Sequence, residues 1–216
     1  MSTNLWGPAA VAAAFAGGFL GAAVHQDPPD PMQQEEVVRA RAFVVVDSSG
    51  KERILIGDSK DGTGLAIKDA AGKYRATLAL TSDAAGTGLA FFNAGGNEVL
   101  ALGSDPAGAA LVIENGEGKP MIGLGVDKTN SGMVLNDEKG VEHFSLGVTR
   151  NGQDAGFGIN DANGKVCASF GTGRTGTGIS LFDGSGKQRL GVSMIPNGAS
   201  AFVIWDKNGK ETWRTP

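Results

Sequence analysis

Short runs of alternating apolar and polar residues recur along the chain from about residue 42, and a small polar turn joins the two runs of each pair. The turns recur every 22 to 24 residues when the turn glycine is taken as the reference. Asp or Asn stands three residues before every turn glycine, and lysine follows the glycine in six of the eight turns. Asp and Asn side chains bond the backbone two residues on, and glycine adopts a positive φ without strain. The turn glycines are Gly50, Gly72, Gly96, Gly118, Gly140, Gly164, Gly186 and Gly209.

The flanks of each turn predict two strands. Large apolar residues stand seven and five residues before the glycine and four and six residues after it, as in Leu111, Ile113, Ile122 and Leu124 around Gly118. A period of two with β-branched and aromatic residues indicates strands, so eight units predict sixteen of them. The residues between the large ones are mostly small. Large side chains are therefore expected on one face and small ones on the other.

The pattern predicts an all-β fold of eight two-stranded repeats, each of about 22–24 residues. In a three-residue hairpin, the large residues of the two strands would face opposite sides of a flat sheet. A β-arch would turn all four large positions inward, and stacked arches form a β-solenoid. The sequence therefore favours a solenoid-like stack, with a rolled or closed meander, such as a barrel or small propeller, as the alternative.

The repeated letters D-x-x-G-K-x-R, as in Asp69 to Arg75, resemble the tandem β-repeats of many uncharacterised bacterial proteins and of fibre-like phage proteins. The resemblance extends from about Val44 to Trp213. Because its defining letters are turn chemistry, it implies an architecture and little about function.

The N-terminal segment predicts a transmembrane helix. Leu5 to Val24 is a run of 20 residues without a charge, which is long enough to span a hydrocarbon core. A signal peptide cleaved after Ala23 is the alternative, although no Lys or Arg precedes the apolar run. The resulting division is a membrane anchor over 1–26, a proline-rich linker with a short helix over 27–41, and the repeat domain over 42–216.

Small residues at four-residue spacing would share one face of this helix and allow another transmembrane helix to approach closely. The expected helix-packing residues are Ala9, Ala13, Gly17 and Gly21. The basic residues nearest the run follow some fifteen residues after it, at Arg39 and Arg41. The weak charge bias favours an N-terminus inside and a repeat domain in a periplasm-like space of a bacterial inner membrane.

The composition mainly argues against certain partners and kinds of site. The formal charge of −4 does not favour a nucleic-acid partner, which requires a basic surface. His143 and the lone Cys167 occupy the slot three residues after the turn glycine, where Arg53 stands in the first repeat, so both are expected to be variants of a repeat position. No catalytic, cofactor-binding or metal-ligating residues are predicted, and the glycine-rich loop over 171–178 lacks the lysine and helix of a phosphate site.

The last repeat is rich in aromatic residues, with Phe202, Trp205 and Trp213. A terminal repeat has no further neighbour to stack on, so these residues either cap the core or dock a partner.

Three functions compete at this point. The first is a non-enzymatic accessory subunit that braces the extrinsic face of a larger membrane complex, such as a photosynthetic reaction-centre–antenna or a respiratory complex. Its partners would be transmembrane helices, extrinsic protein surfaces and lipid. The second is a trimeric adhesin or fibre-like surface protein. The third is a ligand-binding or hydrolytic domain with a site in the loops between repeats, for which the uniform loops offer little support.

Overall fold

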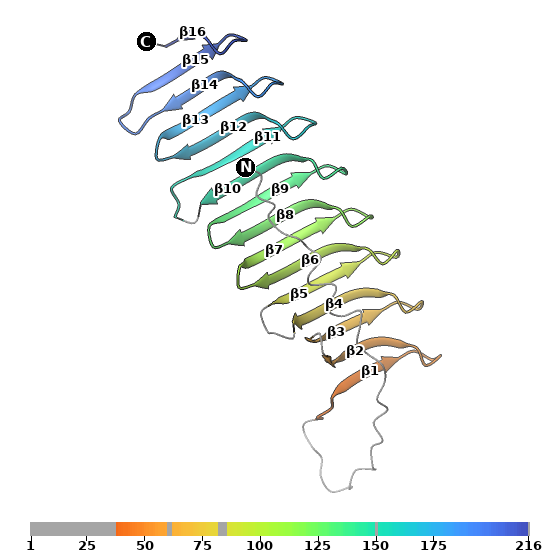
Figure 1. The fold of residues 1–216 in the computed structure, drawn as a ribbon. Helices are drawn as coiled ribbons and strands as arrows, with labels where there is room; N and C mark the ends of the chain where they lie inside the picture. Colours follow the sequence, from red (N-terminus) through yellow and green to blue (C-terminus); the bar gives the residue numbers. More distant parts are fainter. Residues whose placement is uncertain (1–37, 60–61, 82–85, 150, 216) are drawn as a thin grey trace. The chain divides into compact units, whose positions relative to one another are not determined.

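The computed structural model describes residues 38–59, 62–81, 86–149 and 151–215, which form two compact units divided between residues 106 and 107. The first unit is an antiparallel meander of six strands (Figure 1). These strands are β1 (Ala42–Val46), β2 (Glu52–Ser59), β3 (Gly62–Lys68), β4 (Tyr74–Thr81), β5 (Thr87–Phe92) and β6 (Glu98–Asp105).

The second unit is an antiparallel meander of ten strands, in which each strand pairs with its chain neighbours. The strands are β7 (Gly108–Glu114), β8 (Pro120–Asp127), β9 (Asn130–Asn136), β10 (Glu142–Thr149), β11 (Ala155–Asn160), β12 (Val166–Gly173), β13 (Gly176–Phe182), β14 (Gln188–Met194), β15 (Ser200–Trp205) and β16 (Glu211–Arg214). The prediction of sixteen strands is confirmed.

Each repeat turn is built by its aspartate and glycine. In the first repeat, the Asp47 N–H donates to the carbonyl of Lys51, and the Gly50 N–H donates to the carbonyl of Asp47, both at 2.9 Å. Asp47 Oδ1 also accepts the backbone N–H groups of Ser49 and Lys51, at 2.9 and 3.1 Å. Gly50 has a φ of 80°, which glycine adopts without strain. All eight turn glycines have a positive φ between 77° and 94°.

A β-bulge after each turn sets the register of the hairpin. Val46 lies opposite Glu52, but Val45 lies opposite Ile54, so Arg53 is the extra residue. The offset places large residues opposite large residues, and both strands of a hairpin direct them to the same face. The same shift occurs in the other repeats, for example between Ile113 and Glu114.

The expectation of β-arches in a solenoid-like stack is therefore wrong. The alternative was a rolled or closed meander, and it is correct as to the meander but not as to its closure. The prediction counted only the offset from the turn glycine and missed the second offset at the bulge. With both, an ordinary hairpin collects the large residues on one face. The strand order is linear from β1 to β16, as in an open meander rather than a closed one.

The turn lysines connect successive repeats along one edge of each unit. Lys165 Nζ donates to the carbonyl of Gly184 at 3.3 Å, and Lys187 Nζ donates to the carbonyl of Lys207 at 3.4 Å. In the first unit, Lys73 Nζ donates in the same way to Ala94, at 3.2 Å. Each of these bonds joins one turn to the next at the edge of the unit where the D-x-x-G turns line up (Figure 1), and the turns of Gly96 and Gly140 have no lysine at this position.

The N-terminal predictions fall on residues 1–37, outside the described residues. Residues 38–41 precede β1 without regular secondary structure. Within the described ranges, no helix is long and apolar enough to cross a bilayer.

Candidate interaction surface

The large side chains of the second unit gather on one face of its sheet, which we call the apolar face. Its middle row crosses nine neighbouring strands by direct pairing. The middle row consists of Leu111, Leu124, Met133, Leu146, Phe157, Phe170, Ile179, Val192 and Phe202. The row on the turn side consists of Ile113, Ile122, Leu135, Phe144, Ile159, Ala168, Leu181, Leu190, Ile204 and Trp213.

A third row lies toward the opposite edge and completes the apolar face. It consists of Ala109, Val126, Ser131, Val148, Ala155, Thr172, Thr177, Met194 and Ser200. Two of its hydroxyls bond each other, since the Oγ1 atoms of Thr172 and Thr177 lie 2.7 Å apart. None of the residues in the three rows is charged, so the described apolar face of β7–β16 carries no fixed charge.

Much of this face is open to solvent. Fourteen large apolar residues of the three rows are exposed, at 37 to 59% each. They are Ile113, Leu124, Val126, Leu146, Val148, Phe157, Ile159, Phe170, Ile179, Leu181, Val192, Met194, Ile204 and Trp213. Large apolar residues that cover one side of a sheet are normally buried against a second layer. No described segment of the unit forms such a layer.

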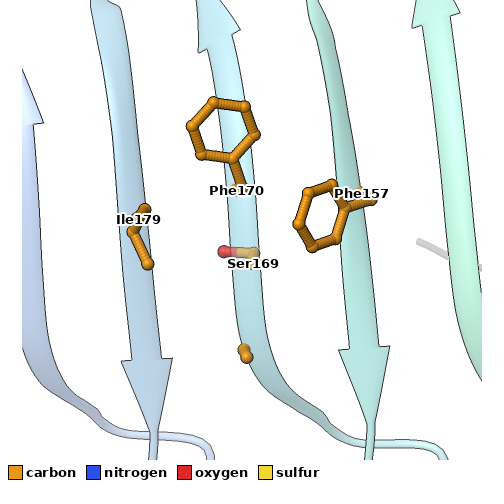
Figure 2. A pocket seen from close by; sticks show the side chains of 5 residues that line it. Phe157, Ser169, Phe170 and Ile179 are labelled. Carbon is orange, nitrogen blue, oxygen red and sulfur yellow. The ribbon is translucent and has the colours of Figure 1, made fainter.

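Three phenylalanines on β10, β11 and β12 form a row of neighbouring rings on the apolar face. The Phe144 and Phe157 rings lie 6.0 Å apart between centroids, and the Phe157 and Phe170 rings lie 5.7 Å apart. Beside them is a shallow hollow lined by Phe157, Phe170, Ile179, Ala168 and Ser169 (Figure 2). The hollow exists because Ala168 is the single small residue in the turn-side row.

The opposite face of the second unit, the small-residue face, has a different design. A row of small residues crosses it, comprising Ala110, Gly125, Gly132, Gly147, Gly156, Gly171, Gly178, Ser193 and Ala201. Several of these glycines have no room for a side chain. A Cβ on Gly156 would lie 2.5 Å from the carbonyl oxygen of Phe170, and a Cβ on Gly132 would lie 2.5 Å from that of Leu146. The glycines therefore allow close backbone approach between neighbouring strands.

Of the three predicted docking aromatics, the structure brings two together and separates the third. Phe202 and Trp213 lie on the apolar face with their rings edge-to-face at 5.2 Å, and Trp213 is 48% exposed. Trp205 lies on the small-residue face, where its ring would be 3.1 Å from a Cβ on Gly191. Gly191 is buried. Trp205 thus covers its own sheet, while Phe202 and Trp213 extend the exposed apolar surface.

The first unit has the same two-faced pattern. Its small-residue face includes Leu55, Ala66 and Ala79, which are buried and form a cluster with Tyr74 packed against it. Lys68 lies over the Tyr74 ring at 5.3 Å and pairs with Glu52 at 2.9 Å. Its apolar face differs from that of the second unit in one charge, Asp58, which accepts a hydrogen bond from the Thr63 hydroxyl at 2.7 Å.

Hydrogen bonds between charged side chains lie mainly at the turn edge, where they stabilise the turns. The Ser185 hydroxyl, followed by the Lys187 N–H, lowers the pKa of Asp183 below its usual range, and Arg189 Nε donates to Asp183 Oδ2 at 2.6 Å. His143 occupies the position of Arg189, with Nε2 lying 3.2 Å from Asp137 Oδ2.

Cys167 occupies the same slot in its repeat, and its thiol donates to the carbonyl of Ile159 at 3.2 Å. The contact of His143 with its turn aspartate therefore matches the sequence-based assignment to a repeat position, whereas the Cys167 thiol bonds a strand carbonyl instead. No cluster of three or more metal-ligating side chains occurs within residues 38–59, 62–81, 86–149 and 151–215.

The expected helix-packing residues Ala9, Ala13, Gly17 and Gly21 lie outside the described residues. The sequence-based prediction also missed part of the apolar face, namely the third row with Val126, Val148 and Met194. These residues stand eight positions after their turn glycines, so extending the alternation by one more step would have found them.

No family model and no curated protein matches this chain. Among solved structures, the chain is similar to a crystal structure of a mutant of S. aureus TarM in complex with Fondaparinux, alpha-GlcNAc-glycerol and UDP. The identity is 14%, the TM-score is 0.22, and the match covers 55% of this chain and 20% of that one. The matched region thus spans about a fifth of that structure's length, and at this TM-score the likeness carries no argument.

Proposed function

We propose that the chain is a non-enzymatic, membrane-anchored scaffold subunit that braces the extrinsic part of a larger membrane complex. The observation that carries the proposal is the charge-free apolar face of β7–β16, with fourteen exposed large residues. A contiguous apolar surface of this extent is typical of a protein-binding surface. Many of the described polar groups at the turn edge stabilise the turns and the links between turns, as in the bonds made by Asp183 and Lys165.

The anchor in this proposal is the uncharged run from Leu5 to Val24. Its length suits a transmembrane helix, and the stripe Ala9, Ala13, Gly17 and Gly21 suits close packing against another helix. The sheet would then be held beside the membrane, with the repeat domain on the periplasmic side of a bacterial inner membrane. A photosynthetic or respiratory complex is the type of assembly that offers both neighbouring helices and extrinsic surfaces.

The test is a native pull-down of the tagged full chain from membranes, with identification of the proteins that accompany it. The double substitution Gly17→Leu and Gly21→Leu places bulky side chains on the predicted packing stripe. A neighbouring helix could then no longer approach closely, so the companion proteins should be released. Gly18→Leu with Ala22→Leu is the matched control, because these residues lie about 100° around the predicted helix from Gly17 and Gly21 and therefore outside the packing stripe. Equal recovery of companions with both double variants would contradict the helix-packing part of the proposal.

The fibre-like surface protein is the second candidate, and the uniformity of the three rows favours it. A stalk uses the repeats along their whole length, whereas a subunit of a complex also needs its membrane helix. Deleting residues 1–26 distinguishes the two. Retained surface function after the deletion supports the fibre, and loss of the companion proteins supports the scaffold subunit.

A further inference from the structure

We infer that the apolar face of β7–β16 is covered by the same face of a second copy of this chain, so that the extrinsic brace is a two-layered sheet built from two protomers. The inference rests on the proposed scaffold function and specifies how the scaffold is completed. Each protomer would supply one layer, since the described part of each unit contains a single sheet.

The exposed area is of the size that a stable pairing needs. Fourteen large side chains at 37 to 59% exposure leave on the order of 1,000 Å² of apolar surface open to solvent. The largest apolar patch of a typical monomer is about 300–600 Å². Each partner in a standard protein interface contributes about 800 Å². The face is therefore too large for an ordinary free surface and large enough for a specific interface.

The regularity of the face favours another copy over a foreign protein. The middle row places a large apolar residue on each of the nine strands from β7 to β15, at the constant spacing of paired strands. A second copy has this spacing by construction and can match the rows along the whole unit. The face also lacks any charge that would select a partner of opposite sign. Apolar faces of two sheets pack about 10 Å apart with their side chains interdigitated.

The hollow beside the phenylalanines determines where a side chain of the second copy would pack against the apolar face. Phe157, Phe170 and Ile179 line the hollow (Figure 2), and Ala168 is the small residue among the residues that line it. Close-packed interiors leave few voids of side-chain size, so a covered face needs a residue that enters this hollow. A large side chain from the middle or turn-side row of the second copy is of the right kind. Two-fold symmetry would fill the equivalent hollow of the partner at the same time.

The test cross-links the full chain in intact membranes. A photoreactive phenylalanine analogue replaces Phe157, and two differently tagged versions of the chain are expressed together. Irradiation should join the two tags, and peptide mapping should place both ends of the link on the apolar face. The mass of the linked species should equal two copies.

Two pairs of matched substitutions control the experiment. The first pair is Val148→Lys and Val166→Lys. Val148 lies on the apolar face, whereas Val166 lies opposite Asn160 on the small-residue face, and both valines are 43% exposed. The Val148→Lys change should lower the yield of the copy-to-copy link at least about tenfold, because it buries an unpaired charge in the interface. The Val166→Lys change should alter it less than about twofold.

If the Val148→Lys variant loses its β circular dichroism, the second pair decides. Ile179→Lys on the apolar face and Ile195→Lys in the β14–β15 turn replace isoleucines that are each 44% exposed. The same contrast in yield is expected. Equal yields within a folded pair would overturn the inference.

The identity of the linked partner provides the remaining outcomes. Links from position 157 only to a different protein, to lipid, or to residues 1–37 of the same chain would overturn the inference, and so would a mass of three copies. The pull-down tests the scaffold function separately. A chain that pairs with itself but has no companions fails as a subunit of a complex, whereas a chain with companions and no self-link fails only in the pairing.

Discussion

The two faces of the β7–β16 sheet are built from alternate residues of the same strands, yet they handle solvent in opposite ways. The apolar face carries large side chains that stay 37 to 59% exposed at fourteen positions. The small-residue face carries mainly glycine, serine and alanine, and bulky residues from its own repeats cover part of it, as Trp205 covers Gly191. The small-residue face is thus partly covered by its own repeats, whereas no described segment of the unit covers the apolar face.

This difference predicts which substitutions affect folding and which affect association. Changes on the small-residue face should lower the stability of each protomer whatever its concentration. Changes on the apolar face should act mainly through the equilibrium between free and covered surface, and that equilibrium depends on concentration.

The largest effect is expected at Gly156. A Cβ there would lie 2.5 Å from the Phe170 carbonyl oxygen, so Gly156→Ala forces the backbones of β11 and β12 apart. We expect a loss of about 2 kcal/mol or more in the free energy of unfolding, as for an overpacked interior. Gly158→Ala is the matched control on the same strand and face, since the nearest atom to its Cβ is Ser145 Oγ at 3.8 Å. Denaturant titration measures both, and similar losses in the two variants would contradict the close-approach explanation.

A smaller effect, which divides between folding and association, is expected for the two tryptophans. Trp205→Ala uncovers Gly191 on the small-residue face and should lower the denaturation midpoint equally at low and high protein concentration. Trp213→Ala removes an aromatic ring that is 48% exposed and packed against Phe202 on the apolar face. The decrease in its denaturation midpoint relative to the wild type should grow with protein concentration. The reason is that the variant loses the covered apolar face that stabilises the wild type at high concentration. Thermal melts over a hundredfold dilution series test this, and identical concentration dependence in the two variants would count against the division.

The sequence predicted the strands and turns well because they depend on local chemistry. A turn such as Asp183 to Gly186 needs an acceptor at its first residue and a positive φ at its fourth, and both requirements appear directly as residue types. The alternation of large and small residues in turn determines which residues share a face.

The arrangement of the faces was harder to predict because it depends on one extra residue. The extra residue of the bulge, such as Arg189, shifts the strand pairing by one position and so places the large residues of both strands on the same face. Without the bulge, these residues would face opposite sides of the hairpin, and only a β-arch would bring them together. The bulge did have a sequence signal, since Arg53, His143 and Arg189 recur at one slot and reach back to their turn aspartates. Its geometric consequence was not evident from residue type. The same limit explains why Trp205 and Trp213 could not be assigned to opposite faces.

The smallest effect is expected at the turn edge, which belongs to neither face and holds the repeats in line. Hydrogen bonds from Ser185 and Lys187 stabilise the ionised form of Asp183 and hold its pKa below its usual range. Backbone bonds act in the same way on the pKa values of Asp137, Asp161 and Asp206. A carboxyl whose pKa is lower in the folded state stabilises the fold above its unfolded value of 3.8, and this contribution is lost as pH falls through that value toward the folded one.

Asp183→Asn tests this contribution with a residue that the chain already uses at two turns, Asn93 and Asn115. The amide oxygen can still accept the turn N–H groups, as Asn115 Oδ1 accepts those of Glu117 and Lys119 at 2.9 and 3.0 Å. The variant should therefore keep its fold, have a lower melting midpoint than the wild type at pH 7, and approach the wild type as pH falls from about 5 toward 2. Both faces should be unaffected, so the Phe157 cross-link should persist in the variant. A midpoint difference that stays constant over this pH range would show that the Asp183 charge contributes nothing to the turn.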